Sequence, residues 1–175
     1  KITSRHLQEM GIVDDVVEME DPATVAAIMV EPIGHTGGLI DPPGEYLPIL
    51  REICDRHGIL LVCDEVMCGL GRTGRWFAAD HWNVVPDMIT MAKGLTSAYL
   101  PLGAVAVSDR IAGYFDKNVF YGGLTYNAHP MSLAAAEACL QVMIDDHTME
   151  HTQRLGGVMS ELHQQMKKKH RSVGD

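Results

Sequence analysis

The sequence predicts an α/β domain with a mainly parallel sheet. Short apolar segments of strand character alternate along the chain with stretches in which apolar residues recur every three or four positions, the spacing of a helix. Parallel strands joined by helices produce this alternation. At 175 residues, 46% of them hydrophobic, the chain can bury one ordinary core.

The first half of the chain predicts the order strand, loop, helix, strand. An apolar run over 25–31 ends at Glu31 before a proline, which is typical of a buried strand. Residues 33–44 contain four glycines and two prolines and are expected to form a loop. Apolar residues at helical spacing follow over 45–57, and a glycine ends that helix. The next apolar run, 58–64, is a second strand that leads to an aspartate.

The second half begins with a turn and two further strands and then changes to helices. The helix after the last proline is alanine-rich without a breaker, and the final helix carries apolar residues at spacings of three and four. We expect a glycine-rich turn at 69–74, strands at 88–91 and 102–107, a short helix capped by Ser108 and Asp109 and running through Phe115, and helices at 132–144 and 149–169.

The composition excludes some classes of partner and indicates the compartment. The formal net charge is −9, whereas nucleic acids and anionic membranes would require a cationic face. The basic cluster at 167–171 is interpreted as a solvated helix end. No apolar stretch reaches the ~18 residues of a membrane helix, the first six residues lack the apolar core of a secretion signal, and the four cysteines lack Cys-x-x-Cys spacing. We therefore expect a cytoplasmic protein with no nucleic-acid or membrane partner.

Two charged residues that close apolar segments suggest an enzyme. Asp64 ends one predicted strand and Lys93 follows another, so adjacent parallel strands would bring both to one edge of the sheet. A lysine amine can form a Schiff base with the aldehyde of a pyridine cofactor, and a carboxylate can keep the ring nitrogen protonated. Taken singly, the two could equally be a strand-end carboxylate and a surface lysine. The small neighbours Ala92 and Gly94 favour a functional pair, because an amine in apolar surroundings loses its proton more readily.

Two other motifs have weaker interpretations. The turn at 69–74 has the form Gly-x-Gly-x-x-Gly, but no long helix follows before Pro86, so a tight turn leading away from Asp64 is favoured over a dinucleotide site. His147 and His151 share a helix face without a His-Glu-x-x-His pattern or a third ligand, which disfavours zinc.

Two residues after the fourth predicted strand have both a functional and a structural interpretation. His129 precedes the alanine-rich helix as either a functional group or a helix-entry residue bonded to backbone. Thr125 follows Gly122 and Gly123, where a hydroxyl and free amides can clasp a phosphate, although threonine in such a loop is usually a turn residue.

Three blocks of sequence together resemble a known family. Residues 62–74 are Val-Cys-Asp-Glu-Val-Met-Cys-Gly-Leu-Gly-Arg-Thr-Gly, residues 86–94 are Pro-Asp-Met-Ile-Thr-Met-Ala-Lys-Gly, and residues 123–130 are Gly-Leu-Thr-Tyr-Asn-Ala-His-Pro. They resemble the signature blocks of the class III, or omega, aminotransferases, which are pyridoxal 5′-phosphate (PLP) enzymes of fold type I. The resemblance covers almost the whole chain in order and spacing.

The resemblance implies roles for five residues. Lys93 would form the Schiff base with PLP and move the proton between substrate and cofactor. Asp64 would pair with the pyridinium nitrogen, and Val66 would pack on the ring face. Thr125 would bind the cofactor phosphate across the interface of a homodimer with shared active sites. Glu31 is similar to a family glutamate that supports the polar surroundings of the cofactor.

The resemblance also implies how the chain is divided. The family's upstream phosphate cradle, ring-stacking aromatic residue and downstream carboxylate-binding arginine have no counterpart here, so we expect a central fragment of the fold. Residues 1–147 would be part of the large cofactor-binding domain, with helices on both faces of its sheet. Residues 148–175 would be the first helix of the small C-terminal domain.

Two departures from the family pattern bear on the substrates. Members that use 2-oxoglutarate often carry a glutamine and a glutamate where this chain has Met67 and Thr36. The chain is thus more similar to the group that transfers amino groups from taurine, β-alanine or other omega-amines to pyruvate. We expect an aminotransferase with a primary omega-amine donor and a 2-oxo acid acceptor, pyruvate preferred. An aminomutase or decarboxylase of the same fold and a non-catalytic fragment are the alternatives.

Overall fold

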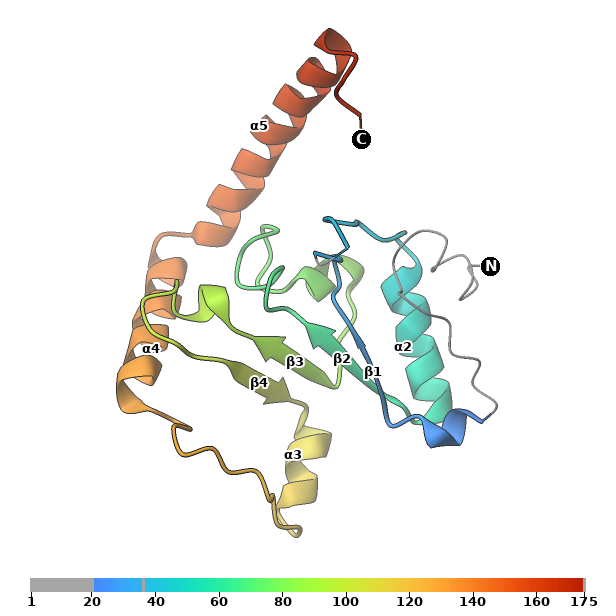
Figure 1. The fold of residues 1–175 in the computed structure, drawn as a ribbon, viewed down its shortest axis with the longest axis vertical. Coiled ribbons are helices and arrows are strands. Elements are labelled where there is room, and N and C mark those ends of the chain that lie inside the picture. Colours follow the sequence, from blue (N-terminus) through green and yellow to red (C-terminus); the bar gives the residue numbers. More distant parts are fainter. Residues whose placement is uncertain (1–20, 36, 175) are drawn as a thin grey trace.

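Four strands form one sheet in the computed structural model, which describes residues 21–35 and 37–174 (Figure 1). Their order in space follows the sequence: β1 (Ala27–Val30), β2 (Leu60–Asp64), β3 (Met88–Met91) and β4 (Ala104–Val107). β1 pairs with β2 and β2 with β3 in parallel, whereas β4 joins β3 in the antiparallel direction. The prediction of an α/β fold with a mainly parallel sheet is confirmed.

Helices connect and follow the strands close to the predicted positions. The first long one, α2 (Tyr46–His57), ends at Gly58, whose φ of 68° is the left-handed conformation that suits a glycine C-cap. The others are α3 (Asp109–Phe115), α4 (Pro130–Asp145) and α5 (Thr148–Lys169), with the short 3-10 helices η1 (Pro22–Thr24), η2 (Ala78–Trp82) and η3 (Lys93–Leu95).

Three details differ from the prediction. β1 is shorter than the expected 25–31, because Val25 is the C-cap of η1 and the pairing with β2 covers only Ala27–Val30. β4 starts at Ala104 rather than at residue 102, since its partner Met91 is the last residue of β3. Ser108 stands at the N-cap position of α3, but its hydroxyl is buried and makes no hydrogen bond within the described residues. The Ser108 N–H is instead bound to the carbonyl of Asp87, which anchors this residue to the start of β3.

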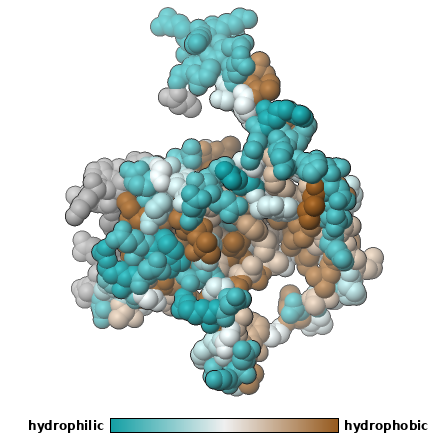
Figure 2. Space-filling model, turned by 180° about the vertical axis from the view of Figure 1, so that it is seen from behind, coloured by the Kyte–Doolittle hydropathy of each residue, from teal (hydrophilic) through white to brown (hydrophobic). Residues whose placement is uncertain are grey.

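The main core lies on the face of the sheet against which α2 packs. Side chains alternate along a strand, and the pairing of Ile28 with Leu61 puts both on the face that contacts Leu47 of α2. On the opposite face, Met29 is 58% and Val105 61% exposed. Hydrophobic residues also gather on the rear surface in Figure 2. Among the described residues, α2 therefore covers one face of the sheet. The helical layer that the sequence predicts for the other face is not formed by these residues.

The chain turns sharply between α4 and α5, and α5 extends away from the sheet (Figure 1). His147, between the two helices, has a left-handed φ of 49°. The expected division into 1–147 and 148–175 falls at this corner and stays a prediction. None of the helices in the described ranges is both long enough and apolar enough to cross a membrane.

Asp87, just before β3, connects three elements through its carboxylate. Oδ2 accepts hydrogen bonds from the Leu61 N–H of β2 and from Arg51 of α2, each at 2.9 Å, and Oδ1 accepts one from Arg110 of α3 at 2.8 Å. The Asp87 side chain is only 12% exposed. Burial by itself would raise the pKa of Asp87, but the Leu61 N–H and the guanidinium groups of Arg110 and Arg51 outweigh it and lower the pKa.

Asp87→Asn should lower the free energy of unfolding by about 2 kcal/mol, because an amide leaves donors of Leu61 and Arg51 poorly satisfied. Since the folded-state pKa is lowered, the contribution of the carboxylate is complete above its ordinary pKa of about 4 and is lost as the pH falls through the folded-state value. Urea unfolding of the full-length protein at several pH values measures both effects. Asp55→Asn is the control, because Asp55 pairs with the same arginine but is 68% exposed, so its loss should cost about 0.5 kcal/mol or less. Equal losses in the two variants would contradict the structural role of Asp87.

Candidate active site

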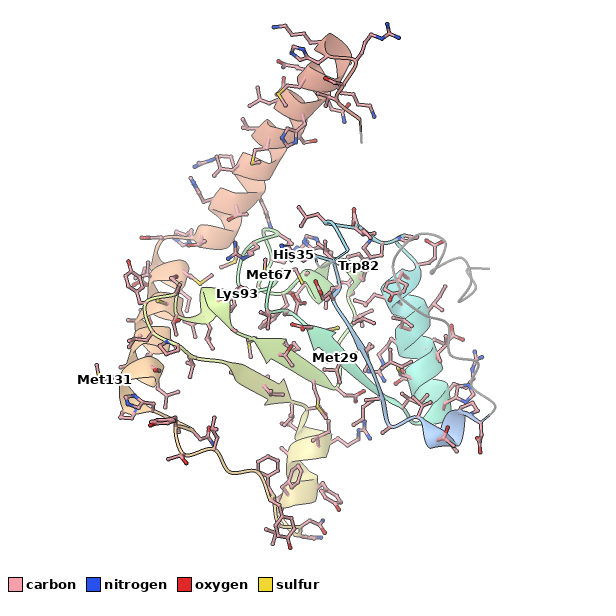
Figure 3. All side chains as sticks on the ribbon, in the orientation of Figure 1. Met29, His35, Met67, Trp82, Lys93 and Met131 are labelled. Atoms are coloured by element: carbon pink, nitrogen blue, oxygen red, sulfur yellow. The ribbon has the colours of Figure 1, made fainter. Side chains whose placement is uncertain are left out.

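The ends of β2 and β3 form the candidate site. Asp64 is the last residue of β2 and stands opposite Thr90 of β3. Lys93 begins η3, two residues after β3 ends at Met91. Because the strands are parallel, both charged residues lie at the same edge of the sheet, as the sequence predicts. Figure 3 labels Lys93 at this edge of the sheet.

Asp64 is held through one of its two carboxylate oxygens. Oδ1 accepts hydrogen bonds from the Val66 N–H and from the Thr90 hydroxyl, each at 3.0 Å. Oδ2 accepts none from the part of the chain that the structure describes. A half-buried carboxylate with one fixed and one open oxygen is suited to receive a charged donor.

The backbone around Lys93 is strained. Lys93 has a φ of 40°, and Ser97 and Ala98 have φ values of 49° and 62°, a region that residues with side chains rarely adopt. Gly94 lets the segment press on the glycine-rich turn, since a Cβ there would lie 3.2 Å from the Cβ of Leu70. Strain of this kind concentrates at functional sites, so the backbone supports a functional role for Lys93.

Lys93 also lines an open cavity of about 1110 Å³. Part of the wall comes from Ala135 and Ala138 of α4, whose small side chains leave the space open. Besides Lys93, the larger or polar lining side chains are those of Leu70, Arg72, Ser97, Tyr99, Cys139, Val142, Met143, Thr148 and Thr152. Asp64 and Val66 do not line the cavity. Lys93 therefore borders both the cavity and the strand edge.

Other predicted residues lie at the same edge. Val66 is half-buried and donates its N–H to the Asp64 carboxylate. Glu31 directly follows β1, which neighbours β2, and its Oε2 accepts the His35 N–H at 2.7 Å. Met67 is half-buried in the turn after β2. Thr36, the second position that bears on the acceptor, lies outside the described residues.

The structure does not bring Thr125 to this edge. Thr125 is exposed in the segment between α3 and α4, which in Figure 1 runs outside β4, the last strand of the sheet. His129 takes the N-cap position of α4 but is exposed and makes no capping hydrogen bond through its side chain. The His129 carbonyl accepts the Leu133 N–H at 3.0 Å, which agrees with the interpretation of His129 as a helix-entry residue.

Two residues of the site were missed by the sequence interpretation. Thr90, which binds Asp64, is the polar residue of an otherwise apolar strand, and this exception is a signal that could have identified it. Glu65 is 1% exposed and accepts two backbone N–H groups from η2. No sequence pattern distinguishes a buried glutamate beside a strand-end aspartate from a solvent-exposed glutamate at the same place.

Comparison with known proteins assigns the family. Residues 3–175 match the sequence model of the family described as aminotransferase class-III. The chain belongs to the class III aminotransferase family. The resemblance carried by the three sequence blocks is thereby confirmed.

Relatives of this class III chain are named as aminotransferases. A probable aminotransferase of Mycobacterium tuberculosis is 45% identical over 142 residues, which make up 80% of this chain and 30% of that protein. Putrescine–pyruvate aminotransferase of Pseudomonas aeruginosa is 42% identical over 127 residues, 72% of this chain and 28% of the relative.

A solved structure confirms the expected fold of PLP-dependent transaminases. Taurine:2-oxoglutarate aminotransferase from Bifidobacterium kashiwanohense, in complex with PLP and glutamate, is similar at a TM-score of 0.86 and 40% identity. The match covers 98% of this class III chain and 36% of that one. The chain thus spans about a third of the length of the relatives it matches.

Proposed function

We propose that the full-length protein transfers an amino group from a primary omega-amine to a 2-oxo acid, with PLP as its cofactor. The observation that carries the proposal is the open oxygen Oδ2 of Asp64 at the same sheet edge as the amine of Lys93. Putrescine and taurine, named for two relatives, are both primary amines whose amino group is remote from any α-carboxylate.

The residues at this edge fit PLP. When bound, PLP offers an aldehyde to an amine and a protonated ring that withdraws electrons from the substrate carbon. Asp64 would hold the charged ring nitrogen through Oδ2, while the Val66 N–H and the Thr90 hydroxyl keep the carboxylate oriented. The half-buried side chain of Val66 would pack on the ring, and Glu31 would keep the neighbouring surroundings polar.

Lys93 would have two tasks. Its amine would bind the cofactor aldehyde between turnovers, and after its release by the substrate the same amine would move a proton from the substrate carbon. The strained start of η3 fixes where this side chain leaves the backbone. The open cavity beside Lys93 provides room for an amine to approach.

We infer that the active unit is a homodimer in which Thr125 serves the site of the partner subunit. The position of Thr125, away from the edge that carries Lys93, favours a role outside its own subunit's site. The same segment exposes Phe120, Tyr121 and Tyr126, and aromatic residues are enriched at protein interfaces. Four free cysteines, three of them buried, support the expectation of a cytoplasmic location.

We propose pyruvate as the preferred acceptor. Met67 stands in the turn that follows Asp64 and Val66, where family members that use 2-oxoglutarate often have a glutamine. A thioether offers no N–H donor to a second acceptor carboxylate, so the longer dicarboxylate gains nothing there. The name of the Pseudomonas aeruginosa relative agrees with pyruvate, whereas that of the Bifidobacterium kashiwanohense relative specifies 2-oxoglutarate.

Lys93→Ala should reduce transfer by about a thousandfold or more, because it removes the aldehyde-binding amine and the proton carrier together. Formation of alanine from pyruvate and putrescine measures the rate in the full-length enzyme. Borohydride reduction followed by peptide mass spectrometry should place the cofactor on Lys93. Lys168→Ala, at the end of α5, is the control and should leave the rate unchanged. Cofactor attached to another lysine would refute the assignment.

With one amine donor, transfer to pyruvate should be roughly tenfold faster than transfer to 2-oxoglutarate, a difference of about 1.4 kcal/mol in transition-state binding. Alanine and glutamate formation are measured side by side in the full-length enzyme. Met67→Gln should narrow the difference, because the amide supplies a donor that the thioether lacks. A wild-type preference for 2-oxoglutarate would show that the acceptor proposal is wrong.

Mixed dimers of Lys93→Ala and Thr125→Ala chains should regain activity that neither parent has. If chains exchange at random, half of the dimers are mixed and one of their two sites is intact, which gives about a quarter of the wild-type activity. Sedimentation confirms that mixed dimers form, and alanine production measures the recovery. Mixed dimers that stay inactive, or an active monomer, would rule out a shared site.

A further inference from the structure

Glu65 is a buried carboxylate, and each partner of its carboxylate among the described residues is a hydrogen-bond donor. Oε1 accepts the Ala79 N–H and Oε2 the Ala78 N–H, each at 2.9 Å. The Cys68 thiol approaches Oε2 at 3.2 Å. Burial and the charge of Glu65 raise the pKa of Cys68 to about 12, so this thiol stays protonated and can donate. No arginine or lysine in the described ranges forms an ion pair with Glu65.

These bonds hold the start of η2 and the turn after β2 against the end of β2. Ala78 and Ala79 begin η2, where backbone N–H groups have no partner within the helix and need an external acceptor. The chain between Glu65 and Cys68 folds back, so that the Gly69 N–H binds the Glu65 carbonyl at 3.0 Å. A Cβ on Gly69 would stand 2.8 Å from that carbonyl oxygen and 2.9 Å from the Glu65 Cβ. Close packing and hydrogen bonds thus fix the position of Glu65.

The immobilised Glu65 lies between the two groups that orient the Asp64 carboxylate. Val66, the next residue, donates one of the two hydrogen bonds to Asp64 Oδ1. The Glu65 N–H binds the carbonyl of Thr90 at 3.0 Å, and the Thr90 hydroxyl donates the other. A shift of Glu65 would therefore move both donors and redirect Oδ2.

We infer that Glu65 is a positioning residue, which fixes the Asp64 carboxylate for the cofactor by locking the turn after β2 onto η2. The inference rests on the proposed function, because it concerns the same strand edge. A carboxylate is required at this position, since both of its oxygens accept hydrogen bonds. An amide would direct its own N–H₂ at a backbone N–H or at the thiol and lose an acceptor.

Glu65→Gln in the full-length enzyme should lower kcat by roughly tenfold to a hundredfold, the effect of a misplacement near 1 Å at a catalytic group. The pH titration of the visible absorbance of the bound cofactor should shift in the same direction as in Asp64→Asn. Glu52→Gln is the matched control, because it makes the same chemical change on an exposed residue of α2 and should alter neither readout. An unchanged absorbance titration in Glu65→Gln would overturn the inference.

A double-mutant cycle separates positioning from general destabilisation. If Glu65 acts through Asp64, Glu65→Gln should cost less than about threefold in kcat once Asp64→Asn is present. Losses that multiply in the double variant would make Glu65 an independent structural residue and overturn the inference. A wild-type enzyme that binds no PLP would instead refute the proposed function, so the two failures are distinguishable.

Gly69→Ala decides the question if Glu65→Gln does not fold. This variant keeps the carboxylate but pushes a methyl group against the Glu65 backbone and Cβ. It should shift the absorbance titration in the same direction as Asp64→Asn does and lower kcat relative to the wild-type enzyme. A folded Gly69→Ala enzyme with wild-type titration, or failure of both variants to fold, would show that Glu65 serves only the fold.

Discussion

The parallel pairing of β2 with β3 is the constraint on which the candidate site depends. Its register puts Asp64 opposite Thr90, so the hydroxyl of one strand orients the carboxylate of the other. A shift of one residue would place an apolar side chain opposite Asp64 and turn the polar groups to the other face. The chemistry of the site is therefore determined first by strand register and only then by the side chains.

The register is secured at both ends of β3. At the start of the strand, Asp87 binds the Leu61 N–H with its carboxylate and donates its own N–H to the Leu61 carbonyl at 2.8 Å. At the far end, the Glu65 N–H extends the pairing one residue beyond the last strand residue of β2. The two anchors are chemically different, since the first adds the carboxylate of Asp87 to a backbone hydrogen bond and the second is a hydrogen bond between backbone groups.

The order of elements and the juxtaposition of Asp64 and Lys93 could be predicted because both follow from local patterns. Apolar runs ending in charged residues identify parallel strands, and parallel strands leave their ends at one edge. The role of Glu65 could not be predicted, because the two N–H groups that donate to its carboxylate lie thirteen and fourteen residues away. They belong to a segment without regular periodicity. The exposed position of Thr125 could not be predicted from the sequence either, since glycines before a threonine do not fix the direction of a loop.

The sheet also determines when the site can exist during folding. Ala27 pairs with Leu60 and Val62 with Met88, so the two parallel pairings join residues 33 and 26 positions apart (60 − 27 and 88 − 62). Loops of that length must close before any of their contacts contribute, which makes such pairings slow compared with helix formation. α2 can form from its own local bonds, but Asp64 and Lys93 come together only when the second loop has closed. Competence to hold a cofactor is therefore acquired late, in the same step that completes the sheet.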